Sequence, residues 1–171
     1  MKGASPLLRI SVGVVVERRV ATSPWVDYLW MPVTVLAGEP VTAPWTPLSS
    51  DGDRTMFYAG TAEIQFFRSE TANYRDNLAS ATPSLWVALR STGGEPPFSI
   101  LAVTADPAEG EALTEAGNDL VEPVPMPRYV QEAAAEFVAA HHVDRGFLKR
   151  QRDPPDPEAL ARRTHGPGDE K

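Results

Sequence analysis

The sequence predicts an α+β fold, in which a strongly curved antiparallel sheet of five or six strands packs against three helices. Three observations predict it. Short segments alternate between apolar and polar residues, as strands with one buried face do. Turns rich in glycine and proline separate these segments, and three other segments contain helix start signals or an apolar stripe at helical spacing. With 171 residues and an apolar fraction of 42%, the chain is long enough to bury one core.

Five segments are expected to be strands, because each is a short apolar or alternating run bounded by turn residues. In chain order they are 9–19, 30–37, 56–67, 84–91 and 98–105. Gly60 is expected to interrupt the third strand. The last two strands are expected to form a hairpin across 92–97, and the length of that loop leaves its geometry open. Residues 41–54 are expected to be a loop, because prolines and a Ser-Ser-Asp-Gly-Asp run dominate them.

Three segments are expected to be helices: 69–79, 107–116 and 127–142. Ser69 is expected to cap the first helix. Asp106, followed by Pro107, gives the second a capping residue and a proline at its first position, and Gly117 gives it a left-handed stop. The third helix has an apolar stripe at spacings of four, three and four, made by Val130, Ala134, Phe137 and His141.

The predicted domain spans residues 1–148, and residues 149–171 are expected to be a disordered tail because prolines and charges dominate them. The longest aliphatic run near the amino terminus, 12–16, is too short to cross a membrane. The chain has no cysteine, which excludes a disulfide framework, thiolate metal sites and a cysteine nucleophile. We therefore expect a cytoplasmic protein with no membrane partner.

The charge of the chain argues against a nucleic-acid partner. The formal net charge is −7, and phosphate contacts need clustered lysines and arginines. The segment 98–127 has six carboxylates and no Lys or Arg. It is either a solvated helix face with a loop or a negative surface for a basic partner.

No pattern of residues indicates a catalytic site, a metal site or a cofactor. The adjacent His141 and His142 point about 100 degrees apart on a helix, so they cannot easily bind one metal. They are better explained as helix-end residues near the negative pole of the dipole. A glycine-rich phosphate loop is missing, because Gly93 and Gly94 precede prolines and no helix start.

The segment 23–36 gives the strongest hypothesis for a binding surface, because it places two tryptophans beside a turn. Trp25, Asp27 and Trp30 are predicted to contact a partner protein, since tryptophan dominates many binding hot spots. The alternative is that both tryptophans close the end of the sheet. Exposure of the indoles separates the two interpretations. A second candidate surface is the rigid extended segment of Glu122, Pro123 and Pro125, which would lose little entropy on docking.

Four segments together resemble a small proteobacterial family of proteins of unknown function. They are Val14–Arg19, Ser23–Val33, Pro83–Val87 and Val121–Pro127, and the resemblance covers about residues 9–152. Members of that family are encoded beside formate dehydrogenase genes, and some bear the name molybdopterin-guanine dinucleotide biosynthesis protein A. Guanylyl transfer is not expected, because true enzymes of that name open with a Gly-Gly loop. Here Gly13 and Gly38 stand singly.

The resemblance implies a non-catalytic accessory or assembly factor for a molybdenum- or tungsten-dependent formate dehydrogenase. Such a factor would bind an immature subunit of that enzyme and would need no cofactor of its own. Two alternatives stay open. A small-ligand-binding protein or an enzyme would have a pocket inside the curved sheet, and a structural subunit would be poorly soluble when isolated. The sequence leaves the oligomeric state open.

Overall fold

Residues 4–144 are described in a computed structural model of the chain, and they form seven strands and three α-helices. A single 3-10 turn, η1, precedes the first helix. The elements are, in order, β1 (Leu8–Val20), β2 (Tyr28–Ala37), β3 (Thr46–Asp51), β4 (Arg54–Phe66), η1 (Arg68–Glu70), α1 (Thr71–Ala79), β5 (Ser84–Ser91), β6 (Phe98–Thr104), α2 (Pro107–Glu115), β7 (Asp119–Pro125) and α3 (Arg128–His141).

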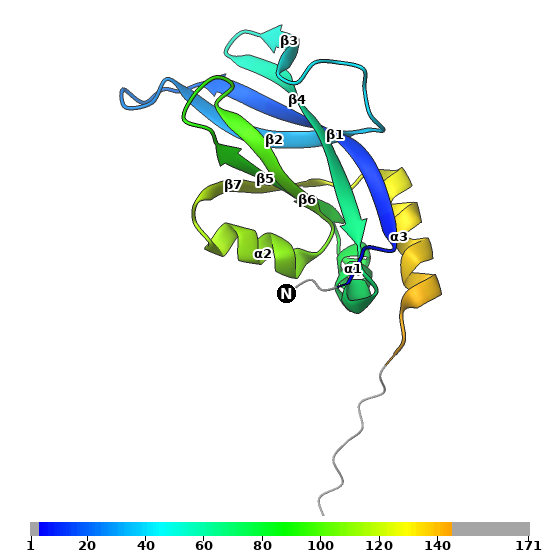
Figure 1. Cartoon of the computed structure of the whole chain (residues 1–171). Helices are drawn as coiled ribbons and strands as arrows, with labels where there is room; N and C mark the ends of the chain where they lie inside the picture. Colours follow the sequence, from blue (N-terminus) through cyan, green and yellow to red (C-terminus); the bar gives the residue numbers. More distant parts are fainter. Residues whose placement is uncertain (1–3, 145–171) are drawn as a thin grey trace, which may run out of the picture.

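The strands form two antiparallel sheets (Figure 1). One has the order β2-β1-β4-β3 and the other the order β6-β5-β7. The α+β class, the antiparallel pairing and the three helices are confirmed. The arrangement differs in one respect: seven strands divide between two sheets, where five or six strands in one curved sheet were expected.

The two strands that sequence did not predict are both edge strands that contain proline. β3 lies inside the segment expected to be a loop, and it pairs only with β4, with an irregularity between Pro47 and Ser49. β7 includes Pro123 and Pro125, and it pairs only with β5. An edge strand tolerates proline, because the missing N–H need not bond a second neighbour. The loop prediction for 46–51 was therefore wrong.

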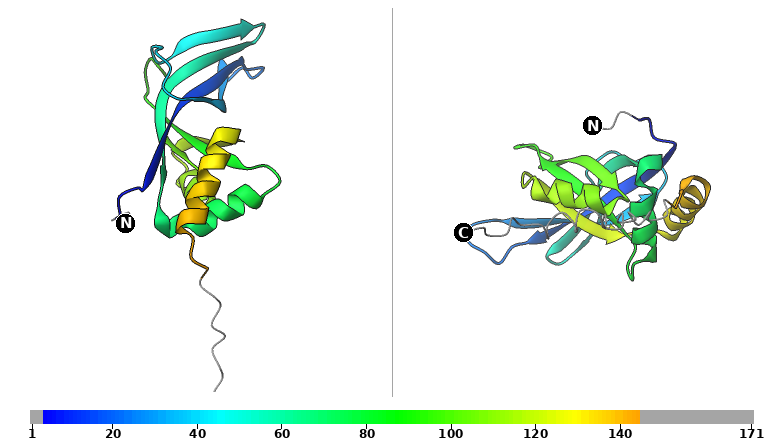
Figure 2. Two further views of the ribbon diagram at one scale, coloured as in Figure 1. Left: turned by 90° about the vertical axis from the view of Figure 1, so that its right-hand side faces the viewer. Right: turned by 90° about the horizontal axis from the view of Figure 1, so that it is seen from below.

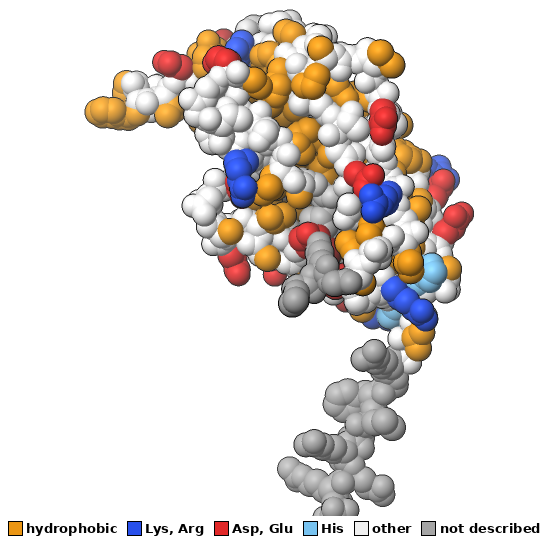
Figure 3. Space-filling model, viewed as in Figure 1, with side chains coloured by type: hydrophobic (Ala, Val, Ile, Leu, Met, Phe, Trp, Pro, Cys, Tyr) orange, Lys and Arg blue, Asp and Glu red, His pale blue; other side chains and the backbone are white. Residues whose placement is uncertain are grey.

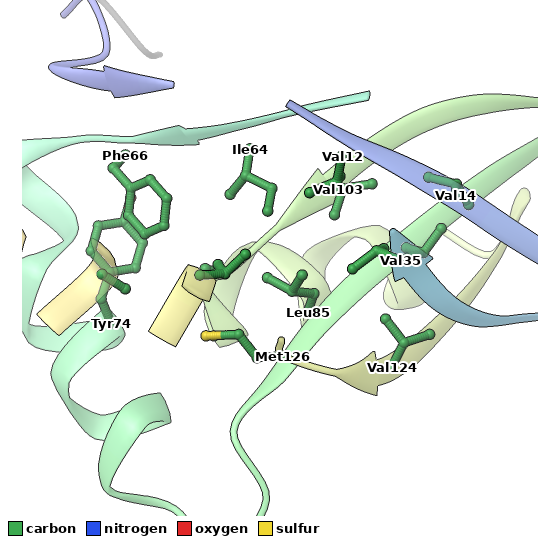
Figure 4. Close-up of a cluster of buried hydrophobic side chains, with 14 of the residues drawn as sticks. Val12, Val14, Val35, Ile64, Phe66, Tyr74, Leu85, Val103, Val124 and Met126 are labelled. Atoms are coloured by element: carbon green, nitrogen blue, oxygen red, sulfur yellow. The ribbon is translucent and has the colours of Figure 1, made fainter. Parts of the chain in front are cut away.

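The interior lies between the two sheets. Alternate valines of β1 (Val12, Val14 and Val16) are fully buried there, as the predicted alternation requires. Alternate residues of β5, including Leu85 and Leu89, enter the same cluster from the other sheet. Figure 4 shows the labelled side chains of both sheets directed into this one cluster.

The expected break in the third strand is a local irregularity in a continuous strand. β4 runs from Arg54 to Phe66, and its register against β1 shifts between Val14 and Val15. Gly60 lies opposite Val14 with φ of 131°, a conformation that side-chain-bearing residues rarely adopt. The irregularity is a β-bulge, which raises the local twist of the pair without ending it.

The helices gather at one end of the molecule, and the long strands β1 and β4 extend from there to the other end (Figures 1 and 2). Asp106 caps α2 as predicted, since its side chain accepts the N–H of Ala108, and Gly117 follows the helix with φ of 74°. Ser69 does not cap α1. It lies within η1, and the capping position falls to Glu70, which makes no side-chain capping bond.

The third helix is confirmed within one residue at each end, and it buries Val130, Ala134 and Phe137. The predicted tail, 149–171, and the domain boundary at 148 lie outside the described residues. Within residues 4–144, no helix combines the length and the apolar character that a membrane crossing requires.

Candidate functional site

The end of the β1–β2 hairpin projects from the body of the molecule (Figure 1). Residues 21–27 connect the two strands, and the N–H of Ala21 donates to the carbonyl of Asp27 at 2.9 Å. The N–H of Trp25 donates to Oγ of Ser23 at 3.2 Å. These bonds hold the connection in a defined turn. Trp25 is 89% exposed at its tip.

Five further apolar side chains around Trp25 are exposed. The whole set, which we name the apolar hairpin end, is Val20, Trp25, Val26, Tyr28, Leu29 and Met31. In the space-filling view, hydrophobic atoms occupy the outermost part of this projection (Figure 3). The register places Val20 and Tyr28 on one face of the hairpin and Leu29 and Met31 on the other. Exposed apolar side chains gathered on one projection mark an interaction site.

Trp30 occupies a different environment from Trp25. It is partly buried and packs against the core, and its ring contacts four other aromatic rings. The centroid distances are 6.4 Å to Tyr28, 6.0 Å to Trp45, 5.7 Å to Phe57 and 5.9 Å to Phe98. We name these five residues the aromatic cluster. Of the two tryptophans predicted as a binding surface, Trp25 is exposed and Trp30 is a packing centre.

Arg18 lies over the aromatic cluster. Its guanidinium carbon is 4.5 Å from the centroid of Tyr28, 5.1 Å from that of Phe57 and 5.8 Å from that of Trp30. The register explains this meeting, because Arg18 pairs with Trp30 and Val20 pairs with Tyr28. Alternate residues of a strand share a face, so the arginine and the rings lie on the same side of the sheet.

The cluster is held by a backbone conformation that is unusual for a large side chain. Trp45 has φ of 66°, a value that costs energy for any residue with a Cβ. Its N–H donates to the carbonyl of Tyr58, and its ring packs on Trp30 and on Phe57. The surrounding contacts therefore offset the local strain and fix the rings in place.

The opposite face of the hairpin has its own ion pair. Oε1 of Glu17 accepts from Arg19 at 3.0 Å, and the Glu17 side chain is almost fully buried. Nε of Arg19 is buried without a hydrogen-bond partner among the described residues. Asp27 is exposed at the turn. Glu17 and Arg19, the charged neighbours of Arg18 in sequence, thus point away from it.

The second predicted surface lies in the other sheet. Glu122, Pro123 and Pro125 belong to β7, where Pro123 pairs with Trp86 and Glu122 with Val87. The two prolines are exposed and Glu122 is partly buried. The structure therefore does not bring this segment onto the β1–β2 turn with Trp25 and Asp27.

The two adjacent histidines sit at the end of α3 and have separate contacts. His141 packs on Phe137 with a centroid distance of 4.6 Å. Nδ1 of His142 is 3.0 Å from the hydroxyl of Thr71, and its Nε2 is 2.9 Å from Arg75. Within the described part of the chain, no three His, Asp or Glu side chains are grouped to hold a metal ion.

Two hollows lie at the margins of the molecule. One of about 1140 Å³ lies between residues 4–7, the start of α1 and the end of α3, and its polar side chains Thr71, Arg75 and His142 bond one another. A smaller one of about 180 Å³ lies between β4 and β6. The space between the sheets, where a ligand pocket was the alternative expectation, contains the packed apolar cluster.

The carboxyl group of Asp106 is buried, and its hydrogen bonds give it a structural role. Burial raises its pKa above the ordinary value. Its Oδ1 accepts the N–H of Ala108 at 2.9 Å and the amide of Asn73 at 3.0 Å. This arrangement caps α2 and joins it to α1, and it needs no catalytic role.

Sequence analysis did not single out Arg18, Tyr28, Trp45, Phe57 or Phe98 as a group. One signal was available, because the i, i+2 spacing of Tyr28 and Trp30 places both rings on one face of a strand. The other members come from β1, β4, β6 and the connection before β3. Only the tertiary pairing brings those segments together.

Comparison with known proteins gives one match. The profile of a family described as "Protein of unknown function (DUF3305)" matches residues 11–152. This range is nearly the one covered by the resemblance drawn from the sequence. No curated protein and no solved structure matches the chain.

Proposed function

We propose, on the premise that the chain belongs to the DUF3305 family of proteins of unknown function, that it is a non-catalytic accessory protein. It binds another protein through the apolar hairpin end. One observation supports this proposal above the others: Trp25 is 89% exposed at the tip of an ordered turn. Leaving so large an apolar ring in water is unfavourable, and a partner that covers it gains that free energy.

The neighbouring side chains favour the same function. Val20, Val26 and Leu29 are each about half exposed near Trp25, so a partner that encloses the hairpin end can bury apolar side chains on both of its faces. The turn is closed by the bond from Ala21 to Asp27, so little conformational entropy is lost on binding. Asp27 is exposed two residues after Trp25 and can select a basic or hydrogen-bonding group at the rim.

The resemblance drawn from the sequence supports one class of partner. Relatives encoded beside formate dehydrogenase genes favour a subunit of a molybdenum- or tungsten-dependent formate dehydrogenase, bound before its maturation is complete. In this proposal the chain holds the immature subunit, and the metal chemistry belongs to the partner.

Affinity purification of the tagged chain from its own host, grown with formate, tests the proposal. Mass spectrometry of the eluate is expected to identify a formate dehydrogenase subunit. Trp25→Ala is expected to reduce its recovery by roughly thirtyfold, since a central tryptophan contributes about 2 kcal/mol or more to binding. The fold of this variant is expected to be unchanged, because substitutions of exposed residues alter stability by about 0.5 kcal/mol at most.

Tyr129→Ala is the matched control, because Tyr129 is an exposed aromatic residue on α3, away from the hairpin. This variant is expected to recover the subunit as the unchanged chain does. A chain that elutes alone under mild conditions would rule out the proposal. Equal recovery by Trp25→Ala and Tyr129→Ala would rule out the apolar hairpin end as the surface.

A further inference from the structure

We propose that Arg18 is the receptor for a carboxylate of the partner protein, supplied by an Asp or Glu side chain that has apolar neighbours. This inference rests on the proposed function, because it names the chemistry that the partner brings to the hairpin. It concerns a residue that sequence reasoning did not select.

The rings of the aromatic cluster hold the guanidinium of Arg18 in one place. Tyr28 and Phe57 lie 4.5 and 5.1 Å from the guanidinium carbon, within the range of a cation–π contact. Such a contact fixes the position of the guanidinium, whose five N–H donors form a planar fork. A planar fork of donors held in one place suits a carboxylate, which accepts two parallel hydrogen bonds.

Within the described part of the chain, no acceptor bonds the N–H groups of Arg18. Among residues 4–144, no hydrogen bond and no ion pair involves its side chain. None of its nitrogens is both buried and unpaired, a condition that applies only to Nε of Arg19 among the described residues. The nitrogens of Arg18 are therefore accessible to an approaching group.

The other arginines of the described residues make the contrast clear. Five of them pair with a carboxylate: Arg9, Arg19, Arg75, Arg90 and Arg128. Arg54 and Arg68 are exposed and solvated. Arg18 is partly buried, is fixed by rings and has no carboxylate partner in residues 4–144. A preorganised, partly desolvated cation binds an anion more strongly than a mobile solvated one does.

The surroundings of Arg18 specify a carboxylate on a protein instead of a free anion. Val20 and Tyr28 lie on the same face of the hairpin as Arg18 and are both exposed. A free anion would gain only the charge contact. A peptide carboxylate flanked by apolar side chains would gain that contact and would also cover these two residues and Trp25.

Two blocked peptides test this chemistry on the full chain: Ac-Leu-Phe-Glu-Leu-NH2 and its counterpart Ac-Leu-Phe-Gln-Leu-NH2. Each is titrated into isotopically labelled protein while the Nε–H resonance of Arg18 and the indole N–H resonance of Trp25 are followed by NMR. The Glu peptide is expected to shift both resonances saturably. The Gln peptide is expected to bind roughly tenfold more weakly, because it loses a charge-assisted bidentate contact.

Arg18→Met keeps the apolar stem and is expected to abolish the preference for Glu over Gln. Arg18→Lys keeps the charge without the planar fork and is expected to retain only part of that preference. Arg54→Met is the matched control, since Arg54 is exposed at the same end of the sheet, and it is expected to keep the full preference. Thermal unfolding of each variant separates loss of binding from loss of fold.

The proposal is overturned if the two peptides bind equally, if neither shifts the Arg18 resonance, or if Arg18→Met keeps the preference. The co-purified partner separates this failure from that of the proposed function. Loss of the partner with Trp25→Ala but not with Arg18→Met overturns the carboxylate receptor alone. Retention of the partner with Trp25→Ala removes the binding surface on which both depend.

Discussion

The buried amide of Asn77 joins three elements of the fold. Its Nδ2 donates to the carbonyls of Ser84 at 2.8 Å and of Ala105 at 2.9 Å. Its Oδ1 accepts the N–H of Ser84 at 3.1 Å. These bonds fix the end of α1 to the start of β5 and to the residue after β6. An asparagine in a helix has low intrinsic preference, and only these bonds explain its presence.

Asn77→Ala is expected to lower the free energy of unfolding by about 3 kcal/mol. The substitution takes a hydrogen-bond partner from the partly buried backbone of Ser84 and from the buried carbonyl of Ala105, and a buried group left without a partner costs about 1–3 kcal/mol. Urea unfolding followed by circular dichroism measures the change. Asn118→Ala is the control, because Asn118 is exposed and has no side-chain hydrogen bond among the described residues. Equal stability of the two variants would show that the Asn77 bonds contribute little.

At the scale of elements, the accuracy of sequence prediction depended on the signal used. The alternation of β1 and the capping Asp106 of α2 are strong local signals, and both were confirmed. Proline was read as a loop residue at 46–51, yet an edge strand accepts it as Pro47 in β3. Ser69 has the right chemistry for a cap, but the chain makes a 3-10 turn there and begins α1 two residues later. Local residue type does not fix such turns.

The contact of α2 with its sheet depends on the missing side chain of Gly110. A Cβ built there would lie 2.3 Å from Cγ of Trp86. Gly110→Ala is expected to destabilise the protein by about 1 kcal/mol. Overpacking costs about 2 kcal/mol, and alanine regains about 1 kcal/mol of helix preference over glycine.

Thermal unfolding and intrinsic tryptophan fluorescence are the measurements for this substitution. Gly94→Ala is the matched control, since a Cβ there meets nothing within 4 Å, and its stability is expected to stay within about 0.5 kcal/mol of the original. A Gly110→Ala variant more stable than the original would mean that α2 shifts without cost.

At the scale of the whole molecule, the class could be predicted and the arrangement could not. Each local pattern predicts that a segment is a strand, but it does not predict which strands pair. The division into two sheets follows from non-local pairs such as β1 with β4. The candidate site, too, could be predicted only where local sequence determines it. Sequence analysis selected Trp25 and Trp30 from their composition, whereas Arg18 became a candidate only through rings that come from β2 and β4.

Global stability at high pH provides a further test, because Tyr74 lies where β4, α1 and α3 meet. Its ring is 4.9 Å from Phe66 and 6.1 Å from Phe137, and its hydroxyl accepts the N–H of Phe67 at 3.0 Å. Burial, helped by the nearby carboxylates of Asp106 and Glu70, raises the pKa of Tyr74 from 10.0 to about 12, and the hydrogen bond from the N–H of Phe67 partly opposes this rise. The folded state therefore holds this proton more tightly than the unfolded state does.

The sign of the pH dependence follows from that difference. Below pH 10 both states keep the proton, so Tyr74 adds no pH dependence. Between pH 10 and about 12 the unfolded state releases it first, and the free energy of unfolding falls by up to about 1.4 kcal/mol per pH unit. Urea unfolding from pH 8 to 11.5 measures this decline.

Tyr74→Phe is expected to be less stable at pH 8, because the Phe67 N–H loses its acceptor, and to show a shallower decline above pH 10. Tyr28→Phe is the control, because Tyr28 is exposed on the β1–β2 hairpin, and it is expected to keep the slope that Tyr74 produces. Parallel declines for the original chain and Tyr74→Phe would assign the alkaline sensitivity to other groups, and would mean that the junction of β4, α1 and α3 tolerates the phenolate.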